Sequence, residues 1–276
     1  IGFEKFMTED EIKQLQRQVS KLQLEAKLRK SVANELERQK NLVQKAKEEA
    51  EAQRQILEEA SRRLSKYLSP QICDEILRGE NFVGIENSRK DLTVFFSDIV
   101  NFTSISERMD PDELGSFLNY YLTAMSELVL KFGGTIDKFI GDAIMVFFGD
   151  PSSEGLRSDA SNCFHMAVEM QDFLAENRDR ICNEYNLPEP LRIRVGIHTG
   201  KCNVGNFGSD QRLEYTAIGR AVNIASRLEN ACEESGILCS EATYVLLQTD
   251  HQFSDEKGIS AKGIENELKA YSWRRA

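Results

Sequence analysis

The sequence contains few of the residues that build zinc sites or disulfide frameworks. Its six cysteines form no CxxC pair, and no cysteine and histidine are spaced as zinc ligands. Its three histidines are too dispersed for an HExxH motif, and His198 lies in an apolar run that is typical of a strand. We therefore expect free thiols in a reducing compartment, and a cytoplasmic location for this chain.

Long apolar runs are missing as well. No stretch approaches the roughly 20 apolar residues that a membrane-spanning helix needs, and no basic segment followed by an apolar one opens the chain as a signal peptide would. The chain begins with Ile1 rather than Met. We expect a fragment of a longer protein, in which an upstream sensor or receptor domain, and any membrane anchor, would precede these residues.

Positive charge is in deficit. The chain has 35 Lys and Arg residues against 45 Asp and Glu residues, so its formal net charge is −10. Affinity for the phosphate backbone is built from clustered Lys and Arg, and we therefore expect no nucleic-acid partner. A nucleotide substrate remains compatible with this charge, because a bound divalent metal supplies the positive charge that the protein lacks.

Glycine and proline are absent from about residue 9 to residue 68, where Glu, Lys, Gln, Arg, Ala and Leu dominate. This composition predicts one long helix. One heptad seam is apolar almost throughout, with Leu15, Leu22, Leu36, Val43, Ala50, Leu57 and Leu64. The other seam begins with Ile12 and Val19 but is polar from Lys40 onward. We predict a parallel two-stranded coiled coil over residues 1–68 that is weak in its second half. The alternative is a single solvated helix.

A linker follows the long helix. Ser69-Pro70 ends the helix, because the residue before a proline avoids the helical region. We predict a linker over residues 69–86 that contains a short amphipathic helix from Gln71 to Leu77. The pattern then changes to alternating strands and helices, which indicates a second domain over residues 87–276.

The second domain is predicted to be α+β. We expect helices at 111–132, 157–180, 221–234 and 240–248, and strands at 92–96, 135–139, 143–148, 191–198, 202–207 and 268–273, with a further short strand before Gly219. Gly141-Asp142 is typical of a tight hairpin turn. This order predicts a mixed sheet with helices on its faces.

Asp98 follows an apolar strand and precedes a turn of small and polar residues. Backbone amides at such a strand-to-helix turn, here at Phe102 and Thr103, can bind phosphate oxygens, and the carboxylate can hold Mg²⁺ beside them. The alternative is a turn-forming or helix-capping aspartate.

Asp142 lies in the predicted hairpin turn after Gly141, which we expect to line the same phosphate site. A turn-forming role alone is again the alternative. If neighbouring strands bring Asp98 and Asp142 together, the two carboxylates can hold two divalent cations about 4 Å apart. Such a pair makes sense mainly with metal bound, because like charges that close repel each other.

Asn223 and Arg227 are four residues apart on a predicted helix, so they lie on one face. An amide and a guanidinium together suit an anionic, trigonal-bipyramidal phosphate with a ribose beside it. The alternative is a surface arginine paired with Glu229 or Glu233.

Four segments resemble the catalytic signature of class III nucleotidyl cyclases, the adenylate and guanylate cyclases. They are FSDIVNFT, KFIGDAIM, GIHTG and AIGRAVNIASRLE, in the family's order, and the resemblance covers roughly Asn87 to Arg274. It implies a ferredoxin-like α/β sandwich with a mixed, mostly antiparallel sheet, here preceded by the long coiled-coil helix. It also implies that two catalytic domains pair head to tail, as a homodimer, with the active sites between them.

The resemblance implies a role for each matched residue. Asp98 and Asp142 match the metal-binding aspartates, with the Ile99 carbonyl as an additional ligand, for two Mg²⁺ or Mn²⁺ ions per active site. Asn223 and Arg227 match the pair with which the other subunit orients the ribose and stabilises the transition state.

Two further residues match the positions that contact the base. Lys138 matches a lysine that accompanies adenine, where glutamate accompanies guanine, and Thr216 is similar to a bacterial-type subgroup that uses ATP. The chemistry agrees, because Lys138 can donate to adenine N1 and Thr216 can accept from its amino group. Guanine would leave donors unpaired at this edge. Lys262 is similar to the family's late lysine that contacts phosphates.

The expected function is therefore that of a homodimeric adenylate cyclase. The ribose 3′-hydroxyl attacks the α-phosphate in line and pyrophosphate leaves, without a protein nucleophile. We expect the coiled coil to relay a signal from the upstream sensor. The alternatives are a guanylate cyclase and a catalytically inactive regulatory or dimerisation module. A diguanylate cyclase is disfavoured, because the sequence has no GG-[DE]-EF motif.

Overall fold

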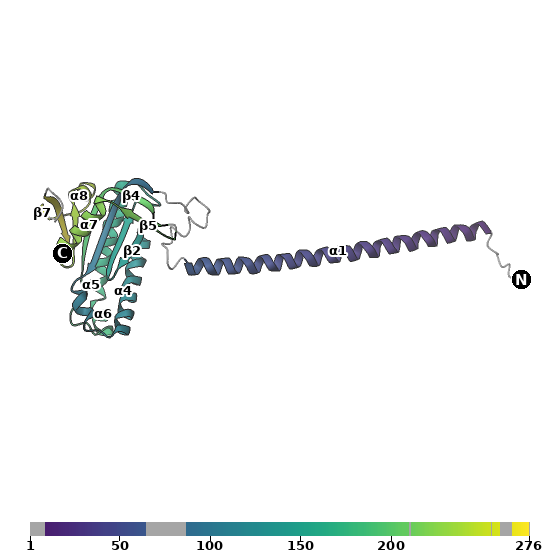
Figure 1. Ribbon diagram of the computed structural model, residues 1–276, viewed down its shortest axis with the longest axis horizontal. Helices are drawn as coiled ribbons and strands as arrows, with labels where there is room; N and C mark the ends of the chain where they lie inside the picture. The colour runs from purple at the N-terminus through teal and green to yellow at the C-terminus, as the bar shows by residue number, and fades with distance from the viewer. Residues whose placement is uncertain (1–8, 65–86, 210, 255, 260–266, 276) are drawn as a thin grey trace. The chain divides into compact units, whose positions relative to one another are not determined.

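The computed structural model describes residues 9–64, 87–209, 211–254, 256–259 and 267–275. The chain forms two compact units, Ile1–Leu64 and Ser65–Ala276 (Figure 1). The predicted linker over 69–86 and its short helix lie outside the described residues, and so does Lys262. The predicted domain boundaries therefore stay predictions.

The first unit is the helix α1, Glu9–Leu64, which confirms the predicted long helix. Acidic residues in its first turn and basic residues in its last turn complement the helix dipole. Side-chain pairs one turn apart, such as Arg54 with Glu58 at 2.7 Å, stabilise its polar faces. The apolar seam residues, among them Leu36, Val43 and Leu57, are exposed in the single chain. Among the described helices, none combines the length and apolarity needed to cross a membrane.

The second unit is a sheet with helices on both faces. Its strands are β1 (Asn87–Ile99), β2 (Thr135–Ile140), β3 (Ala143–Phe148), β4 (Ile193–Ser209), β5 (Arg212–Ile218), β6 (Gly236–Ser240), β7 (Lys257–Ile259) and β8 (Leu268–Arg274). Its helices are α3 (Phe102–Ser106), α4 (Pro111–Lys131), α5 (Leu156–Glu176), α6 (Arg178–Glu184), α7 (Arg220–Ala231) and α8 (Glu241–Leu247).

The sheet is mixed and mostly antiparallel, as predicted. Its strand order is β2-β3-β1-β4-β6-β8-β7, and β5 pairs with one end of β4. Within the described residues, only the ladder between β4 and β6 is parallel. The central strands β1 and β4 pair along the whole length of β1, so they form the frame from which site residues project.

Alternating side chains of β1 pack against different helices. Phe95 lies in the larger core cluster with residues of α4 and α5, which lie along one face of the sheet (Figure 1). Val94 and Phe96 point to the other face and pack near Ala221 and Ala225 of α7. This alternation follows from the two-residue period of a strand. Helix α7 therefore lies on the same face as every even-numbered side chain of β1, including Asp98.

Gly196 of β4 allows α7 to lie close to the sheet. A Cβ atom at Gly196 would lie 2.1 Å from the Glu229 backbone nitrogen and 2.3 Å from the Ala225 carbonyl oxygen. Both contacts are with backbone, so no side-chain movement would relieve them. The glycine therefore holds the C-terminal half of α7, with Glu229, directly over β4.

Two predicted boundaries are wrong. The strands expected at 191–198 and 202–207 are one strand, β4, because Thr199 and Gly200 continue the ladder opposite Thr93 and Leu92 of β1. The helix expected over 157–180 is two helices, α5 and α6, separated at Asn177. The Phe173 carbonyl accepts hydrogen bonds from both the backbone N–H and the side-chain amide of Asn177, at 3.0 and 2.8 Å, where the two helices meet.

Two strands were not predicted. The segment Gly236–Ser240 is too short to show a period, yet it forms β6, whose five residues are all buried between β4 and β8. Burial of this kind is typical of strands covered on both faces. The strand β7 has three residues and pairs only with β8 among the described strands. The partners of β6 lie far away in the sequence, whereas β7 is too short for a sequence pattern to indicate it.

Candidate active site

Asp98 and Asp142 lie side by side at the end of β1. Asp98 is the last residue but one of β1, and Asp142 lies in the turn that joins β2 to β3. Because β3 pairs with β1, this turn lies beside the end of β1. The backbone N–H of Ile99 donates a hydrogen bond to Asp142 Oδ2 at 3.0 Å. The structure thus brings together Asp98, Ile99 and Asp142, the three residues predicted to hold metal.

The turn itself explains the glycine beside Asp142. Ile140 pairs with Ala143, so Gly141 and Asp142 form the predicted two-residue hairpin turn. Gly141 has a φ of 67°, a conformation that a glycine adopts without strain. A Cβ atom there would meet no atom within 4 Å. The requirement for glycine is therefore one of backbone conformation, which in turn directs Asp142 toward Asp98.

The acidic pair is electrostatically unfavourable by itself. Burial raises the pKa of Asp142 to about 7, and the neighbouring Asp98 adds to the rise through a hydrogen bond that favours the protonated form and through its charge. A second negative charge at this place needs a cation. The site fits a divalent metal for this reason, and carboxylate oxygens are the ligands that Mg²⁺ and Mn²⁺ prefer.

No group of three or more His, Cys, Asp or Glu side chains in the described residues is arranged to hold a metal ion. A metal at the acidic pair would therefore take further ligands from backbone oxygen, water and phosphate. This ligand set is usual for Mg²⁺ in phosphate-transfer sites, where one or two carboxylates are combined with substrate oxygens.

Two charged residues that the sequence did not indicate complete this cluster. Arg194 lies opposite Asp98 in the ladder between β1 and β4. Its Nη2 lies 2.9 Å from Asp98 Oδ2, and its Nε lies 3.6 Å from Oε1 of Glu229 on α7. Burial raises the pKa of Glu229 to about 7, and the charge of Asp98 raises it further. One guanidinium thus faces two carboxylates, those of Asp98 and Glu229. The sequence signal that could have indicated Arg194 is its charge within the apolar first half of β4.

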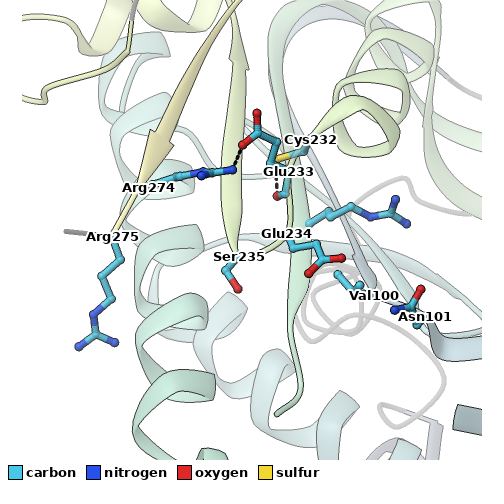
Figure 2. A pocket seen from close by; sticks show the side chains of 9 residues that line it. Val100, Asn101, Cys232, Glu233, Glu234, Ser235, Arg274 and Arg275 are labelled. Atoms are coloured by element: carbon cyan, nitrogen blue, oxygen red, sulfur yellow. Dashed lines mark hydrogen bonds and ion pairs between the residues drawn. The ribbon is translucent and has the colours of Figure 1, made fainter. Parts of the chain in front are cut away.

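Arg194 also lines a pocket of about 700 Å³ beside the acidic pair. Val100 and Asn101, which follow Asp98 and Ile99 in the chain, form part of its wall (Figure 2). Figure 2 shows Arg274 reaching toward Glu233, with which it forms an ion pair, while Arg275 points away from both. Arg275 pairs instead with Asp172 at 3.1 Å. The charges of Arg274 and Arg275 are therefore balanced by carboxylates.

The predicted phosphate loop follows directly. Asn101 has a φ of 59°, and the five-residue helix α3 begins after it. The partly buried Phe102 side chain packs against the larger core cluster. Thr103 is exposed. The structure places both residues beside Asp98, and their contact with phosphate stays a prediction.

The residues predicted to contact the base also lie together. Lys138 is on β2 and Thr216 on β5, two strands that are not paired in the sheet. Thr216 Oγ1 donates to Asp137 Oδ2 at 2.7 Å, and Lys138 Nζ lies 3.8 Å from Asp137 Oδ1. Lys138 Nζ also lies 3.3 Å from Glu214 Oε2 on β5. Asp137 and Glu214, which connect the two predicted residues, had no signal in the sequence.

Asn223 and Arg227 lie on the outer face of α7. Ala221, Ala225 and Leu228 are buried against the sheet, whereas Asn223 is exposed and Arg227 is half-buried. Arg227 and Glu229 are two residues apart, so they point about 200° away from each other around the helix. The face that carries Asn223 and Arg227 is therefore turned away from the chain's own acidic cluster.

The alternative assignment for Arg227 is wrong. Glu229 pairs with Arg194, and Glu233 pairs with Lys257 at 2.7 Å and with Arg274. No ion pair found in the described ranges includes Arg227. His198, by contrast, is a hydrogen-bonded strand residue as expected, with Nδ1 at 2.7 Å from Ser240 Oγ. The five cysteines in the described residues are free.

Comparison with known proteins agrees with these findings. Residues 85–274 match the family described as the adenylate and guanylate cyclase catalytic domain. An adenylate cyclase from Anabaena cylindrica is 35% identical over 202 residues, which cover 68% of this chain and 39% of that protein. The terminal-differentiation specific adenylate cyclase of Dictyostelium discoideum is 41% identical over 165 residues, which cover 58% of this chain and 7% of that protein.

A solved structure is also similar. The adenylyl cyclase CyaB from P. aeruginosa has a TM-score of 0.66 and 47% identity, and the match covers 68% of this chain and 95% of that one. The chain spans less than half the length of the two curated relatives above.

Proposed function

The chain belongs to the family of adenylate and guanylate cyclase catalytic domains, and from this we propose that it converts ATP to 3′,5′-cyclic AMP and pyrophosphate. We assign the catalytic domain to residues 87–276. The observation that carries the proposal is the hydrogen bond from the Ile99 N–H to Asp142, because it holds a second carboxylate beside Asp98 at the end of a central strand.

Asp98 and Asp142, with the Ile99 carbonyl, would hold two Mg²⁺ or Mn²⁺ ions per active site. The raised pKa of Asp142 supports this, since burial and the neighbouring Asp98 disfavour its charged form, and a bound cation would offset that cost. When bound, the metal ions would activate the ribose 3′-hydroxyl and compensate the negative charge of the triphosphate.

The chain's own cations and amides would bind the triphosphate. Arg194 already lies 2.9 Å from Asp98, and a guanidinium in that place can donate to phosphate oxygens. The backbone of Phe102, Thr103 and Gly141 lies next to the acidic pair and would line the phosphate site. Lys262 is proposed as a further phosphate contact.

The complete site requires a second copy of the chain. Asn223 and Arg227 face outward from α7, so they would act on the acidic pair of a partner subunit. Four apolar side chains near Lys138 and Thr216 are 38–55% exposed, and they fit a subunit contact: Phe139, Ile140, Leu213 and Ile218. A homodimer would therefore contain two sites, each built from both subunits.

The reaction would then follow from positioning. Asn223 of one subunit orients the ribose so that its 3′-oxygen lies in line with the α-phosphate. Attack forms the new phosphoester bond, pyrophosphate leaves, and Arg227 stabilises the charge that develops on the α-phosphate oxygens. No protein nucleophile takes part.

Lys138 and Thr216 favour ATP over GTP as the substrate. Lys138 can donate to adenine N1, and the Thr216 hydroxyl can accept from the 6-amino group. Guanine presents donors at N1 and at its 2-amino group, which Lys138 cannot pair. A guanylate cyclase remains the second candidate, because the matched family includes both activities.

We further propose that α1 pairs with α1 of the second copy as a parallel coiled coil. The exposed seam residues of α1 support this, since pairing would bury them. The weak second half of the seam would let an upstream sensor change the arrangement of the catalytic domains.

Product analysis tests the proposal. The purified protein is incubated with ATP or GTP and Mg²⁺ or Mn²⁺ over a range of protein concentrations, and cyclic nucleotide and pyrophosphate are quantified. We expect cyclic AMP from ATP, little cyclic GMP, and a specific activity that rises with protein concentration. Equal or faster formation of cyclic GMP would identify a guanylate cyclase. Nucleotide binding without turnover would identify an inactive module.

A further inference from the structure

Asp137 is a buried carboxylate in the base-binding region that has no role in the proposal above. Its side chain is 1% exposed. Oδ2 accepts the hydrogen bond from Thr216, whereas Oδ1 is buried without a hydrogen-bond donor among the described residues. A buried carboxylate with an unsatisfied oxygen costs stability. Such a residue calls for an explanation other than folding.

The neighbouring charges hold Asp137 in place. Burial raises the pKa of Asp137, whereas the hydrogen bond from Thr216, the charge of Lys138 and a hydrogen bond from the Ala217 backbone lower it. Lys138 is in turn fixed by Glu214, which lies on the same strand as Thr216. Asp137 therefore lies between the two residues proposed to contact the base, and it contacts both.

We propose that Asp137 is a specificity-determining positioning residue, which accepts the only proton of the Thr216 hydroxyl and so leaves that oxygen able to accept, but not to donate, a hydrogen bond to the base. This inference rests on the proposed contact between Thr216 and the base. A threonine hydroxyl has one proton and two lone pairs. With the proton committed to Asp137 across 2.7 Å, only lone pairs remain for the substrate.

The two purines differ at this point. Adenine carries a 6-amino group, which is a donor, whereas guanine carries a 6-oxo group, which is an acceptor. A threonine hydroxyl that is free to rotate can satisfy either group. A hydroxyl held by Asp137 can satisfy only the amino group, and it would place two acceptors against each other if guanine were bound. Asp137 thus converts an ambiguous side chain into one that selects a 6-aminopurine.

Two substitutions of Asp137 test this. Asp137→Asn keeps the shape but offers an amide that can donate to Thr216, and Asp137→Leu removes the partner altogether. Lys138 has a side chain that is 37% exposed and keeps its ion pair with Glu214, so Asp137→Leu leaves no buried charge without a partner and is expected to fold. The measured quantity is the ratio of kcat/KM for ATP to kcat/KM for GTP. Both variants should lower this ratio by roughly tenfold, the range of one hydrogen bond.

The matched control is Asp91→Asn. Asp91 is an exposed carboxylate on β1 that pairs with Lys201 at 3.1 Å, outside the site. Its ratio should equal that of the wild type. A purely structural role of Asp137 would lower both rates equally and leave the ratio unchanged, which would overturn the inference.

Thr216 variants separate this inference from the proposed function. Thr216→Val should lower the ratio, and adding Asp137→Leu should then cause no further fall; a further fall would overturn the positioning role. Thr216→Ser keeps the hydroxyl and should therefore keep the wild-type ratio. A lower ratio in Thr216→Ser would count against the inference, and this result can be obtained even if both Asp137 variants fail to fold. If Thr216→Val left the ratio unchanged, the base contact in the proposed function would itself be wrong. If Thr216→Val lowered the ratio but neither Asp137 variant did, only the present inference would fail.

Discussion

The guanidinium of Arg194 donates a hydrogen bond to the carboxylate of Asp98 across 2.9 Å. The two residues are 96 positions apart in the sequence and lie opposite each other in the ladder between β1 and β4. Arg194 also approaches Glu229, so the fold places one positive charge between two carboxylates, one of which is half of the acidic pair. In the absence of metal, this arginine compensates the acidic cluster.

Removal of Arg194 should therefore destabilise the protein without metal. We expect Arg194→Ala to lower the free energy of unfolding by about 1–3 kcal/mol, because partly buried carboxylates lose their cation. Denaturant unfolding in the presence of EDTA measures this. Added Mg²⁺ should raise the midpoint more in the variant than in the wild type. Arg192→Ala, which removes a more exposed arginine, is the control. An unchanged stability of Arg194→Ala would contradict the assigned compensation.

Asp142→Asn should separate activity from stability. We expect the rate to fall at least about a thousandfold, since metal binding is worth several kcal/mol in the transition state. The same change removes a half-buried negative charge that repels Asp98, and asparagine keeps an oxygen for the Ile99 N–H. The melting temperature in EDTA should therefore be equal to or above that of the wild type. Asp91→Asn on β1 serves as the control with full activity.

If Asp142→Asn lowered the stability of the protein but kept its activity, the metal assignment would be wrong. Asp98→Ala with full activity would have the same meaning, because Asp98 is the other half of the pair.

Two inactive variants should restore activity when they are mixed. In Asp98→Ala the acidic pair is broken, and in Arg227→Ala the outward face of α7 is changed. A heterodimer of the two contains one intact site and one doubly altered site. After random exchange, about one quarter of the wild-type specific activity is expected, since half of the dimers are mixed and each has one working site. Product formation after mixing measures it, and no gain would place both residues in the same subunit's site.

Stability should depend on pH through His198. Burial lowers its pKa to about 4, and the charge of Arg220 lowers it further. Between about pH 6.5 and pH 4 the unfolded chain binds a proton at this residue that the folded chain does not bind, so stability is lost as the pH falls through this window. The loss is at most about 3 kcal/mol at 1.36 kcal/mol per pKa unit.

The comparison with His198→Gln isolates this effect. The free energy of unfolding of the wild type should fall more steeply below pH 6.5 than that of the variant, and the two curves should be parallel above it. Parallel curves over the whole range would show that folding does not lower the pKa of His198.

Insertions in α1 test the proposed relay. Four residues added between Leu36 and Leu64 rotate the seam, whereas seven residues restore it. We expect the four-residue insertion to change the cyclase rate and the seven-residue insertion to leave it close to that of the uninterrupted chain. If both insertions left the rate unaltered, the relay would have to be abandoned.

The sequence alone indicated those features that depend on neighbouring residues. A segment without glycine or proline forms α1, and Gly141-Asp142 forms the predicted turn because glycine tolerates a φ of 67°. The spacing of Asn223 and Arg227 placed both on one face of α7. The residues left the meeting of Asp98 and Asp142 conditional on how the strands pair, and the resemblance to class III cyclases predicted it.

Tertiary structure alone decided which other charges join these residues. β4 is one strand rather than two because β1 pairs with it along its length, and that register puts Arg194 opposite Asp98. Gly196 brings Glu229 to the same point. Asp137 on β2 accepts a hydrogen bond from Thr216 on β5, although these two strands are not paired in the sheet. Local preferences set helices and turns, but strand register and close approach depend on partners that are distant in the sequence, which no local pattern contains.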